Sequence, residues 1–414
     1  MRTEVPEKKY RLAILQRHPI QYHSPIFREI AQSAKIEQTV LFMDKIGLKP
    51  IFDPTMNGVI EWDIPLLEGF RHEFLTNWSP CKTSFFINRI NPGILWRLKR
   101  GRYDGVLIQG YDTASNMLAL LVARLARLDI IFRGEVVSRS SRGSLFTKFF
   151  KSCIVRMFLR NSDAVLYTCR GNRKFFLHSG CPDSKLYPFP CAVDNDFFRA
   201  SRAELRKSKT NLRDELGIDE NTIVAMMVGR MDTNKRQKDL IQAAVRLQDQ
   251  GRNVATVFVG NGSERKRLEN FAKTNKVEKI HFVGFKNQSQ ISGYYDMADV
   301  FCICSEADRS PKVINEALNF ELPIISSDRP GTIGDSIIEG ENALVYKCAD
   351  VDALAACLDR LITNPELRRK FGKRSFELSD ELSLKVDVES LERVVEILQM
   401  AKCKGATHRR IMKR

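Results

Sequence analysis

Four residues in the second half of the chain have charges and spacings suited to binding an anion and a sugar. Arg230 and Lys235 follow an apolar run that ends at Gly229, and a helical pattern begins directly after them. Two cations beside a helix N-terminus attract an anion, because their charges add to those of the unpaired backbone amides. Asp308 and Glu316 are spaced so that one lies in a loop and the other about two turns along a helix. Carboxylates in such positions can hold sugar hydroxyls.

Each of these features also has an ordinary structural explanation. The two cations can belong to a solvated charged turn, Asp308 can be a loop acid, and Glu316 can be a surface acid of its helix. The G-N-G turn at Gly260 fits a tight strand-to-helix turn equally well, because the third glycine of a dinucleotide-binding fingerprint is missing. Gly284 ends another apolar run, at a point where a planar base can approach the backbone closely.

The segment around Asp308 also carries the signal of a helix start. Pro311 is predicted at the first helical position, and Ser310 is predicted as its N-cap. The backbone amides of Lys312 and Val313 would then face the same site.

Short apolar runs rich in Val, Ile and Leu alternate along the chain with stretches of helical spacing. This alternation predicts an α/β fold with two open parallel sheets, because buried parallel strands are continuous apolar runs. Strands are predicted in the first half at 11–15, 38–42, 105–108, 130–132 and 164–167. In the second half they are predicted at 223–228, 255–259, 280–283, 300–304, 323–326 and 343–346.

The length of 414 residues predicts two or three domains, at about 150 residues per domain. A charged segment at 199–222 separates two sets of strand and helix alternation, so domains are predicted over 1–200 and 201–380. The remainder, 381–414, is predicted as a helix with one apolar stripe followed by a basic tail.

The composition, 43% apolar and 28% charged, is that of a globular protein, which excludes fibrous and wholly disordered classes. The net charge of +16 favours anionic partners: nucleic acid, phosphorylated metabolites or an acidic membrane.

The ten cysteines have no zinc-binding spacing, which favours reduced structural thiols. The chain has neither a signal-peptide core nor an apolar run of about 20 residues, so a cytoplasmic protein is expected, with only peripheral membrane contact.

Taken together, the motifs of the second half resemble those of the family-4 glycosyltransferases, also called glycosyl transferases group 1. The resemblance runs in order from about residue 222 to 375 and includes GR-x(4)-K at 229–235, VGNGSE, HFVGF, ADVF-x-x-x-S and the Asp308-x(7)-Glu316 pair. The segment CAVDNDFF at 191–198 resembles the interdomain element of the family. Three segments of the first half resemble a bacterial surface-polysaccharide subgroup: HPIQYHSP, EWDIPLLEGFRHEFL and FRGE.

The resemblance implies a GT-B fold, in which two doubly wound, Rossmann-like domains face a cleft. It implies retaining transfer of a hexosyl-type sugar from a nucleotide-sugar, bound by the second domain, to a glycan or lipid-linked acceptor, bound by the first. The nucleotide-sugar is then a co-substrate, and no cofactor is expected. The last helix is implied to cross back to the first domain.

The same resemblance assigns roles to individual residues. It implies that Arg230 and Lys235 hold the diphosphate, that Glu316 holds the ribose, and that Asp308 touches the transferred sugar. It implies a wider donor-binding set of Gly229, Gly260, Gly284, Phe285, Pro311, Lys312 and Val313. The chemistry agrees, because the departing diphosphate develops negative charge that a preorganised cationic, amide-lined pocket stabilises. Lysine and arginine can therefore replace a divalent metal, and no metal site is expected.

The chain departs from the family pattern at two places. The family usually has Glu where this chain has Asp308, whose carboxylate is one methylene shorter, so specificity or activity is expected to change. The family also often has a Gly-Gly pair after the first strand, where this chain has polar and proline residues. His18 and His23 in that segment are either hydrogen-bond donors to the ligand or ordinary polar loop residues.

Candidate acceptor-side residues follow the predicted strand at 130–132. Arg133 and Glu135 are expected at its carboxyl end, where parallel sheets bind ligands. Glu135 is a candidate for orienting the acceptor hydroxyl, although a salt bridge with Arg133 or Arg139 is the favoured alternative. A retaining transfer does not require a strong protein base, because the departing phosphate oxygen can take the acceptor proton.

Two basic, aromatic stretches at 85–102 and 144–160 are candidates for contact with an anionic membrane surface. In the second stretch five residues can share a helical face: Phe146, Phe149, Phe150, Ile154 and Phe158. Packing against the sheet explains the same spacing and is the favoured alternative. Peripheral association with the inner face of the cytoplasmic membrane is expected.

The alternatives to a transferase are a catalytically degenerate GT-B binding or scaffold protein and a basic nucleic-acid-binding protein. Nucleic acid is not the expected partner, because the sequence has no recognised nucleic-acid module.

Overall fold

The computed structural model describes residues 8–80, 86–136, 145–190, 192–207 and 212–411. Contacts between residues divide the chain into two compact units. Unit 1 comprises Met1–Leu48, Pro65–Cys191 and Leu384–Arg414, and unit 2 comprises Lys49–Ile64 and Ala192–Ser383. The units meet in the sequence at Cys191 and Ala192, near the predicted domain boundary at residue 200.

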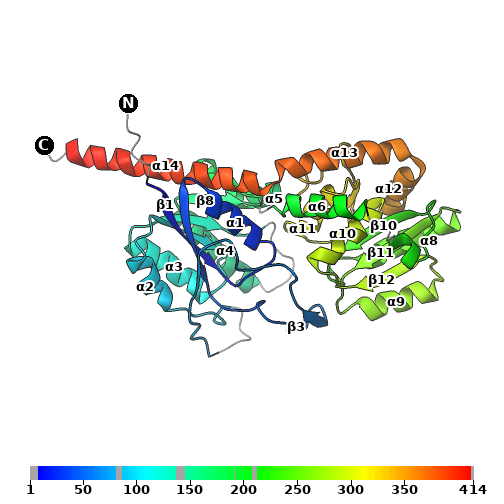
Figure 1. Cartoon of the computed structure of the whole chain (residues 1–414), viewed down its shortest axis with the longest axis horizontal. Coiled ribbons are helices and arrows are strands. Elements are labelled where there is room, and N and C mark those ends of the chain that lie inside the picture. Colours follow the sequence, from blue (N-terminus) through cyan, green and yellow to red (C-terminus); the bar gives the residue numbers. More distant parts are fainter. Residues whose placement is uncertain (1–7, 81–85, 137–144, 191, 208–211, 412–414) are drawn as a thin grey trace. The chain divides into compact units, whose positions relative to one another are not determined.

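Unit 1 contains, in its described part, a sheet of seven strands in the order β5-β2-β1-β6-β7-β8-β9 (Figure 1). Every neighbouring pair in this sheet is parallel. The strands are β1 (Tyr10–Gln16), β2 (Ile36–Phe42), β5 (His72–Phe74), β6 (Gly105–Gln109), β7 (Asp129–Arg133), β8 (Ala164–Tyr167) and β9 (Leu186–Pro188). The helices are α1 (Ser24–Gln32), α2 (Gly93–Arg100), α3 (Ala114–Leu125), α4 (Leu145–Asn161), α5 (Arg170–His178) and α14 (Leu384–Ile411).

Both faces of this sheet are covered by helices. Along β1, Ala13 and Leu15 belong to a core shared with α2, α3 and α4. Leu12 and Ile14, which point to the opposite face, belong to a core shared with α1 and α14. Because both faces are buried, the strands have few polar positions, which explains their continuous apolar runs in the sequence.

The helix α14 packs on unit 1 through the apolar stripe that its sequence predicts. The buried residues of this stripe include Leu391, Val394, Val395 and Leu398. A polar contact flanks this stripe: Lys35 forms an ion pair with Glu396 at 2.7 Å.

Unit 2 contains a sheet of six strands in the order β12-β11-β10-β13-β14-β15 in the part that the structure describes. The strands are β10 (Ile223–Val228), β11 (Val254–Val259), β12 (Ile280–Gly284), β13 (Val300–Ile303), β14 (Ile324–Ser327) and β15 (Ala343–Tyr346). The helices are α6 (Asn195–Leu205), α7 (Leu212–Glu215), α8 (Gln237–Asp249), α9 (Arg265–Thr274), α10 (Gln288–Met297), α11 (Lys312–Leu318), α12 (Val351–Thr363) and α13 (Pro365–Glu381). A separate antiparallel hairpin consists of β3 (Ile51–Asp53) and β4 (Gly58–Ile60).

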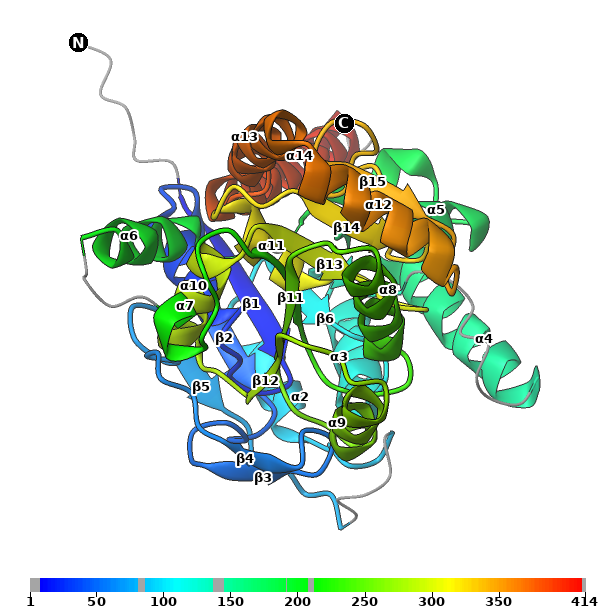
Figure 2. The ribbon, with the colours of Figure 1, turned by 90° about the vertical axis from the view of Figure 1, so that its right-hand side faces the viewer.

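One face of the unit 2 sheet shares a hydrophobic core with α8, α9, α12 and α13 (Figure 2). The strands on either side of β10 come from different parts of the sequence: β11 is the next strand in the chain, whereas β13 is the third strand after β10. This is the order of a doubly wound sheet, and the direction of winding reverses between β10 and β13. The predicted fold of two doubly wound, Rossmann-like parallel sheets is confirmed.

The sequence missed the shortest strands. Two three-residue strands, β5 and β9, form the edges of the unit 1 sheet, and neither was predicted. An edge strand needs little apolar sequence, and β9 ends with Pro188, which is tolerated there because an edge strand leaves one side unpaired. The hairpin of β3 and β4 was also not predicted.

Candidate functional site

The central strands β10 and β13 bring two distant loops of unit 2 together. They are neighbours in the sheet, with Ala225 opposite Val300. Ligands of doubly wound sheets bind where the winding reverses, at the carboxyl ends of the strands. The loop after β10 carries Arg230 and Lys235, and the loop after β13 carries Asp308. The topology thus places the predicted anion-binding residues and one predicted sugar-binding carboxylate at the same edge.

The two loops are joined by polar contacts. The Nζ of Lys235 forms an ion pair with Oδ2 of Asp308, and the two side chains are only 17% and 14% exposed. The Nδ2 of Asn234 donates to the carbonyl of Ala307 at 2.6 Å, and the Glu306 amide donates to the carbonyl of Asn234 at 2.8 Å. Asp308 is therefore not an isolated loop acid, because its charge is held beside that of Lys235. Arg230, in contrast, is exposed.

The glycines that follow β10 and β11 allow these two strand ends to touch. Gly260 has a φ of 132°, and a Cβ built there would lie 2.1 Å from the carbonyl oxygen of Gly229. A Cβ at Gly262 would lie 2.4 Å from the carbonyl oxygen of Met231. The Met231 amide donates to the carbonyl of Asn261 at 2.9 Å, which holds the two turns together. Close backbone packing alone accounts for the G-N-G turn, in agreement with the tight-turn explanation.

Glu316 lies on α11 and is buried, at 2% exposed, so the alternative of a surface acid is wrong. The hydroxyl of Tyr295, on α10, donates to Oε2 of Glu316 at 2.7 Å. The ring of Tyr295 stacks on Phe320 with centroids 5.4 Å apart. The hydroxyl contact was not foreseen from the sequence, because Tyr295 and Glu316 are 21 positions apart on different helices.

The start of α11 differs from the prediction by one residue. Pro311 is the N-cap, with φ −69° and ψ 110°, and the helix begins at Lys312. Proline restricts φ but not ψ, so it fits the extended N-cap as well as the first helical position. Ser310 therefore lies outside the helix. Pro311 is buried, and Lys312 and Val313 are half-buried.

The third predicted strand end, at the end of β12, also has a glycine with an unusual backbone conformation. Gly284 has a φ of 78°, in the left-handed region that favours glycine. Its carbonyl accepts from the amide of Gly260 at 2.8 Å, which connects the ends of β11 and β12. Phe285 follows and is half-buried.

Three of the four acceptor-side candidates meet in unit 1. Arg133, at the end of β7, is 3% exposed, and its Nη2 donates to Oε1 of Glu135 at 2.7 Å. Its Nη1 lies 3.4 Å from Nε2 of His23 and also donates to Oε1 of Gln109. The predicted salt bridge between Glu135 and Arg133 is confirmed, and Arg139 lies outside the described residues.

Two glutamines of this cluster were missed. Gln16 ends β1, and its Nε2 lies 2.8 Å from Nδ1 of His23, while Gln109 ends β6. The sequence signal that could have identified these glutamines is that each is the last residue of a buried strand. The fourth candidate, His18, contacts the carbonyl of Pro19 at 3.0 Å. Burial lowers the pKa of the His18 imidazole, and the hydrogen bond to Pro19 opposes this shift only in part.

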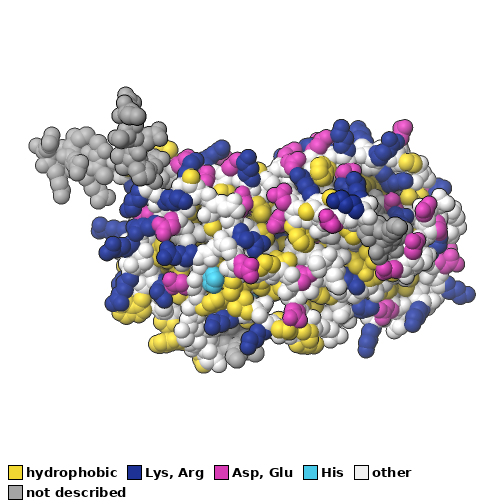
Figure 3. All heavy atoms as spheres, viewed as in Figure 1, with side chains coloured by type: hydrophobic (Ala, Val, Ile, Leu, Met, Phe, Trp, Pro, Cys, Tyr) yellow, Lys and Arg dark blue, Asp and Glu magenta, His cyan; other side chains and the backbone are white. Residues whose placement is uncertain are grey.

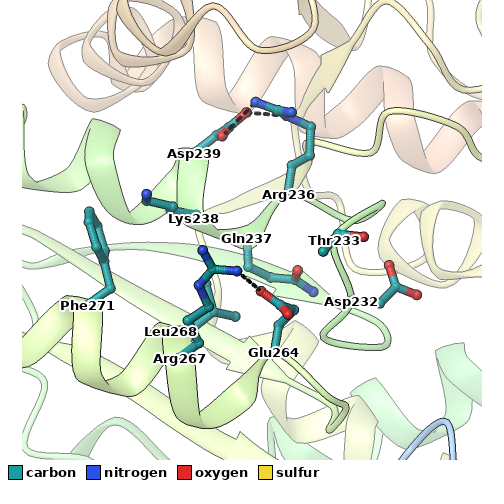
Figure 4. Close-up of a pocket in the computed structure, with 10 residues that line it drawn as sticks. All are labelled: Asp232, Thr233, Arg236, Gln237, Lys238, Asp239, Glu264, Arg267, Leu268 and Phe271. Carbon is teal, nitrogen blue, oxygen red and sulfur yellow. Dashed lines mark hydrogen bonds and ion pairs between the residues drawn. The ribbon is translucent and has the colours of Figure 1, made fainter.

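A pocket of about 200 Å³ lies between the start of α8 and α9, and Figure 4 shows its lining. Its cations face partners inside the pocket: Arg236 pairs with Asp239 at 2.7 Å, and Arg267 pairs with Glu264 at 3.4 Å. Lys238 lies over the ring of Phe271, 4.5 Å from its centroid. None of the four predicted catalytic residues lines this pocket, so it is separate from the candidate site.

The Asp350-Val-Asp352 segment, whose D-x-D spacing also occurs in metal-dependent transferases, caps the start of α12. Asp350 is the N-cap, and its Oδ1 accepts from the amide of Ala353 at 2.9 Å, while Asp352 pairs with Arg246 at 2.6 Å. Among the described residues there is no cluster of three His, Cys, Asp or Glu side chains that could hold a metal ion. The same residues include no helix that is long and apolar enough to cross a membrane.

Comparison with known proteins finds a family match within unit 2. Residues 208–378 match the family model of glycosyl transferases group 1. An α-1,4-N-acetyl-D-galactosaminyltransferase of Campylobacter jejuni, which acts on a diphospho-undecaprenol-linked saccharide, is 26% identical over 47% of this chain and 55% of its own length. The alpha-monoglucosyldiacylglycerol synthase of Acholeplasma laidlawii is 29% identical over 40% of this chain and 41% of its own. The alignments thus span about half the length of these curated relatives, or less.

Solved structures cover nearly the whole chain and establish the fold. The sucrose-phosphate synthase of Thermosynechococcus elongatus superposes with a TM-score of 0.69 over 95% of this chain and 100% of its own, at 17% identity. Anabaena HepE in complex with UDP gives a TM-score of 0.70 over 94% and 100%, at 15% identity.

Proposed function

Because this chain belongs to glycosyl transferases group 1 through residues 208–378 and has the GT-B fold, we propose that it is a retaining, metal-independent glycosyltransferase. It moves a hexosyl-type sugar from a nucleotide-sugar to a glycan or lipid-linked acceptor in bacterial-type surface polysaccharide synthesis. The observation that carries the proposal is the ion pair of Lys235 with Asp308, at the point where the winding of the unit 2 sheet reverses.

In this proposal the loop after β10 binds the leaving group. Lys235 and Arg230 supply positive charge to the diphosphate as the glycosidic bond breaks, which is the role that a divalent metal has in other transferases. The low exposure of Lys235 favours it as the stronger contributor, because charges act more strongly away from water. The nucleotide-sugar is a co-substrate, and the protein uses no cofactor.

The two carboxylates hold the remaining parts of the donor. Buried Glu316, fixed by the Tyr295 hydroxyl, accepts hydrogen bonds from the ribose. Asp308 accepts from a hydroxyl of the transferred sugar, and its ion pair with Lys235 holds it beside the diphosphate. The wider donor-binding set contributes backbone contacts at Gly229, Gly260, Gly284, Phe285, Pro311, Lys312 and Val313.

The acceptor binds at the cluster of unit 1. His23, Arg133 and Glu135 offer both donors and acceptors for sugar hydroxyls, at the carboxyl ends of β1 and β7. Because Glu135 already pairs with Arg133, its carboxylate orients the acceptor hydroxyl and does not act as a strong base. The departing phosphate oxygen takes the acceptor proton.

The donor is identified by incubating the protein with UDP-, GDP-, ADP-, CMP- and dTDP-sugars. One donor is expected to raise the melting temperature and to be hydrolysed slowly. Arg230→Ala is expected to weaken donor binding about tenfold, because it removes one charge-assisted contact with the diphosphate. The rise in melting temperature and the rate of hydrolysis are then both expected to be smaller. Lys273→Ala, which removes an exposed lysine of α9, is the control and is expected to change neither.

Two results would contradict this assignment. Stabilisation without hydrolysis or transfer to any added acceptor would support a degenerate binding protein instead. No response to any donor would remove the basis for the donor site.

The nucleic-acid alternative is not favoured by the surface in Figure 3. On the face that the figure presents, Lys and Arg side chains are interspersed with Asp and Glu.

Membrane association is part of the proposal, and α4 supports it. Ile154, Met157 and Phe158 of this helix pack into the core of unit 1, so the packing explanation holds for them. Phe149 and Phe150 are instead 69% and 55% exposed. Exposed aromatic residues on a basic helix favour the interface of an anionic membrane. The names of two relatives, an alpha-monoglucosyldiacylglycerol synthase and an undecaprenol-linked transferase, support a lipid-linked acceptor.

Sedimentation with vesicles tests this association. The wild-type protein is expected to bind vesicles that contain phosphatidylglycerol and not vesicles of phosphatidylcholine alone. Replacing both Phe149 and Phe150 with serine is expected to weaken binding about tenfold or more, because it removes most of the apolar area that enters the interface. The matched control is Met400→Ser, which removes a residue of α14 with 56% exposure. Equal binding by both variants would argue against α4 as the contact.

A further inference from the structure

The arm Lys49–Ile64 is a segment of the first half of the chain that belongs to unit 2. Its strands β3 and β4 pair antiparallel with each other and with neither of the two large sheets. Two three-residue strands have little stability by themselves in water. The position of the arm is therefore set by its contacts with the rest of unit 2.

The end of the arm runs along the segment that follows β12. The backbone carbonyl of Glu61 accepts from Nδ2 of Asn287 at 2.7 Å. The ring of Trp62 lies 6.4 Å from that of Phe285, at 69° to it. This edge-to-face arrangement is one that aromatic pairs prefer. Trp62 is half-buried, so part of its ring remains accessible.

The next residue of the arm contacts the first turn of α10. The carboxylate of Asp63 accepts from the backbone amide of Ser289 at 3.0 Å and from the Ser289 hydroxyl. A carboxylate at this end of a helix is stabilised by the unpaired amides there. Glu61, Trp62 and Asp63 thus make three successive contacts with the segment after β12.

The hairpin of the arm meets the two neighbouring strand ends. Nδ2 of Asn261, in the turn after β11, contacts the carbonyl of Asn57 at 3.5 Å. Asp53 lies near enough to Arg230, after β10, for that cation to help lower the pKa of Asp53. Burial opposes this shift, and hydrogen bonds from Thr55 and the Met56 amide favour it. The arm therefore contacts the segments after β11 and β12, and its Asp53 lies within electrostatic range of Arg230 after β10.

We infer that the arm forms one wall of the donor site and that Trp62, packed against Phe285, contacts the nucleoside base. The inference rests on the proposed function, because the segments at the ends of β11 and β12 that the arm contacts carry Gly260, Gly284 and Phe285 of the proposed donor-binding set. Aromatic side chains bind bases through their faces and tolerate different bases. Trp62 is accordingly a binding residue for the base, and Asp63 is a positioning residue that fixes it.

The experiment uses the three tryptophans of the chain. Trp78 and Trp96 lie in unit 1, so a W78F/W96F protein keeps Trp62 as its single tryptophan. UDP, GDP, ADP, CDP and dTDP are titrated into this protein and into the wild type. The Trp62 emission is expected to change saturably, with the same Kd that calorimetry gives for the wild type.

Substitutions then test whether the contact contributes to affinity. Trp62→Ala is expected to raise the Kd about tenfold, and Trp62→Phe, which keeps an aromatic face, to raise it less than threefold. Val59→Ala, which removes a 62% exposed residue of the same arm, is the control and is expected to leave the Kd unchanged. The melting temperature of each variant without nucleotide shows whether it is folded.

The possible failures are distinguishable. Nucleotide binding by Trp62→Ala with a Kd within twofold of wild type would overturn the role of the arm and leave the proposed function intact. Tighter binding would overturn it too, because the arm would then block the site. If no nucleoside diphosphate binds the wild type, the donor site and the inference are both overturned.

Discussion

Replacing Lys235 with alanine is expected to lower kcat/KM for the nucleotide-sugar roughly 100- to 1,000-fold. The ammonium group forms an ion pair with Asp308, and both side chains are largely shielded from water. The substitution removes a cation from the diphosphate and also leaves the Asp308 carboxylate without its lysine partner, where it repels the diphosphate. Steady-state kinetics with the donor identified by the panel would measure the loss.

The companion variant Asp308→Asn separates these two effects. It is expected to bind the nucleoside diphosphate at least as tightly as wild type, because Lys235 is then fully available to the phosphates. It is also expected to lower kcat, because the carboxylate that contacts the transferred sugar is lost. The double variant K235A/D308N is expected to bind the nucleoside diphosphate more tightly than Lys235→Ala alone, because the unpaired carboxylate is then absent. Additive losses would contradict the coupling of the pair.

A nearby lysine in the first turn of α8 is the control for charge alone. Lys238 lies three residues further along and contacts the ring of Phe271 in the separate pocket. Lys238→Ala is expected to change kcat/KM less than twofold, a limit set by the weakness of exposed charges. A comparable loss in both lysine variants would show that net charge, and not the position of Lys235, attracts the donor.

Replacing Glu316 with alanine is expected to weaken nucleoside diphosphate binding about 100-fold, because a buried site built for ribose hydroxyls loses its acceptor. Glu316 is 2% exposed and accepts from the hydroxyl of Tyr295. Comparison of the ribose and deoxyribose forms of the bound nucleotide provides a specific readout. Wild type is expected to prefer the ribose form, and Glu316→Ala is expected to bind both forms equally. An unchanged preference would contradict the ribose contact.

Tyr295→Phe tests whether the Glu316 carboxylate acts directly. This variant keeps the ring that stacks on Phe320 and removes only the hydroxyl that contacts Glu316. The expected loss of affinity is about three- to tenfold, the size of one hydrogen bond. A loss as large as that of Glu316→Ala, with a lowered melting temperature, would show that both residues act through the packing of α10 on α11.

The central strands of both sheets could be predicted because burial on both faces leaves a strong local pattern. Predicted strands at 164–167, 223–228 and 343–346 coincide with β8, β10 and β15. The edge strands β5 and β9 could not be predicted, because three residues with one unpaired side carry almost no such pattern.

The arm is a clearer failure of local reasoning. Its sequence lies within the predicted first domain, 1–200, yet contacts group it with unit 2. Glu61 and Asn287 are 226 positions apart, and Asp63 and Ser289 are also 226 apart. Neither short segment indicates which residues it contacts, because many different pairs of polar residues can form such single hydrogen bonds.

The sequence by itself determined which chemical groups are present and on which elements they lie. Arg230 and Lys235 were placed after a strand, and Glu316 on a helix, because strand and helix patterns depend on neighbouring residues. Only the tertiary structure decided which groups meet. Lys235 contacts Asp308, 73 residues away, because the sheet places β10 beside β13, and His23 meets Arg133 because β6 brings β1 and β7 together. Strand order is a property of the whole sheet, so no local pattern contains it.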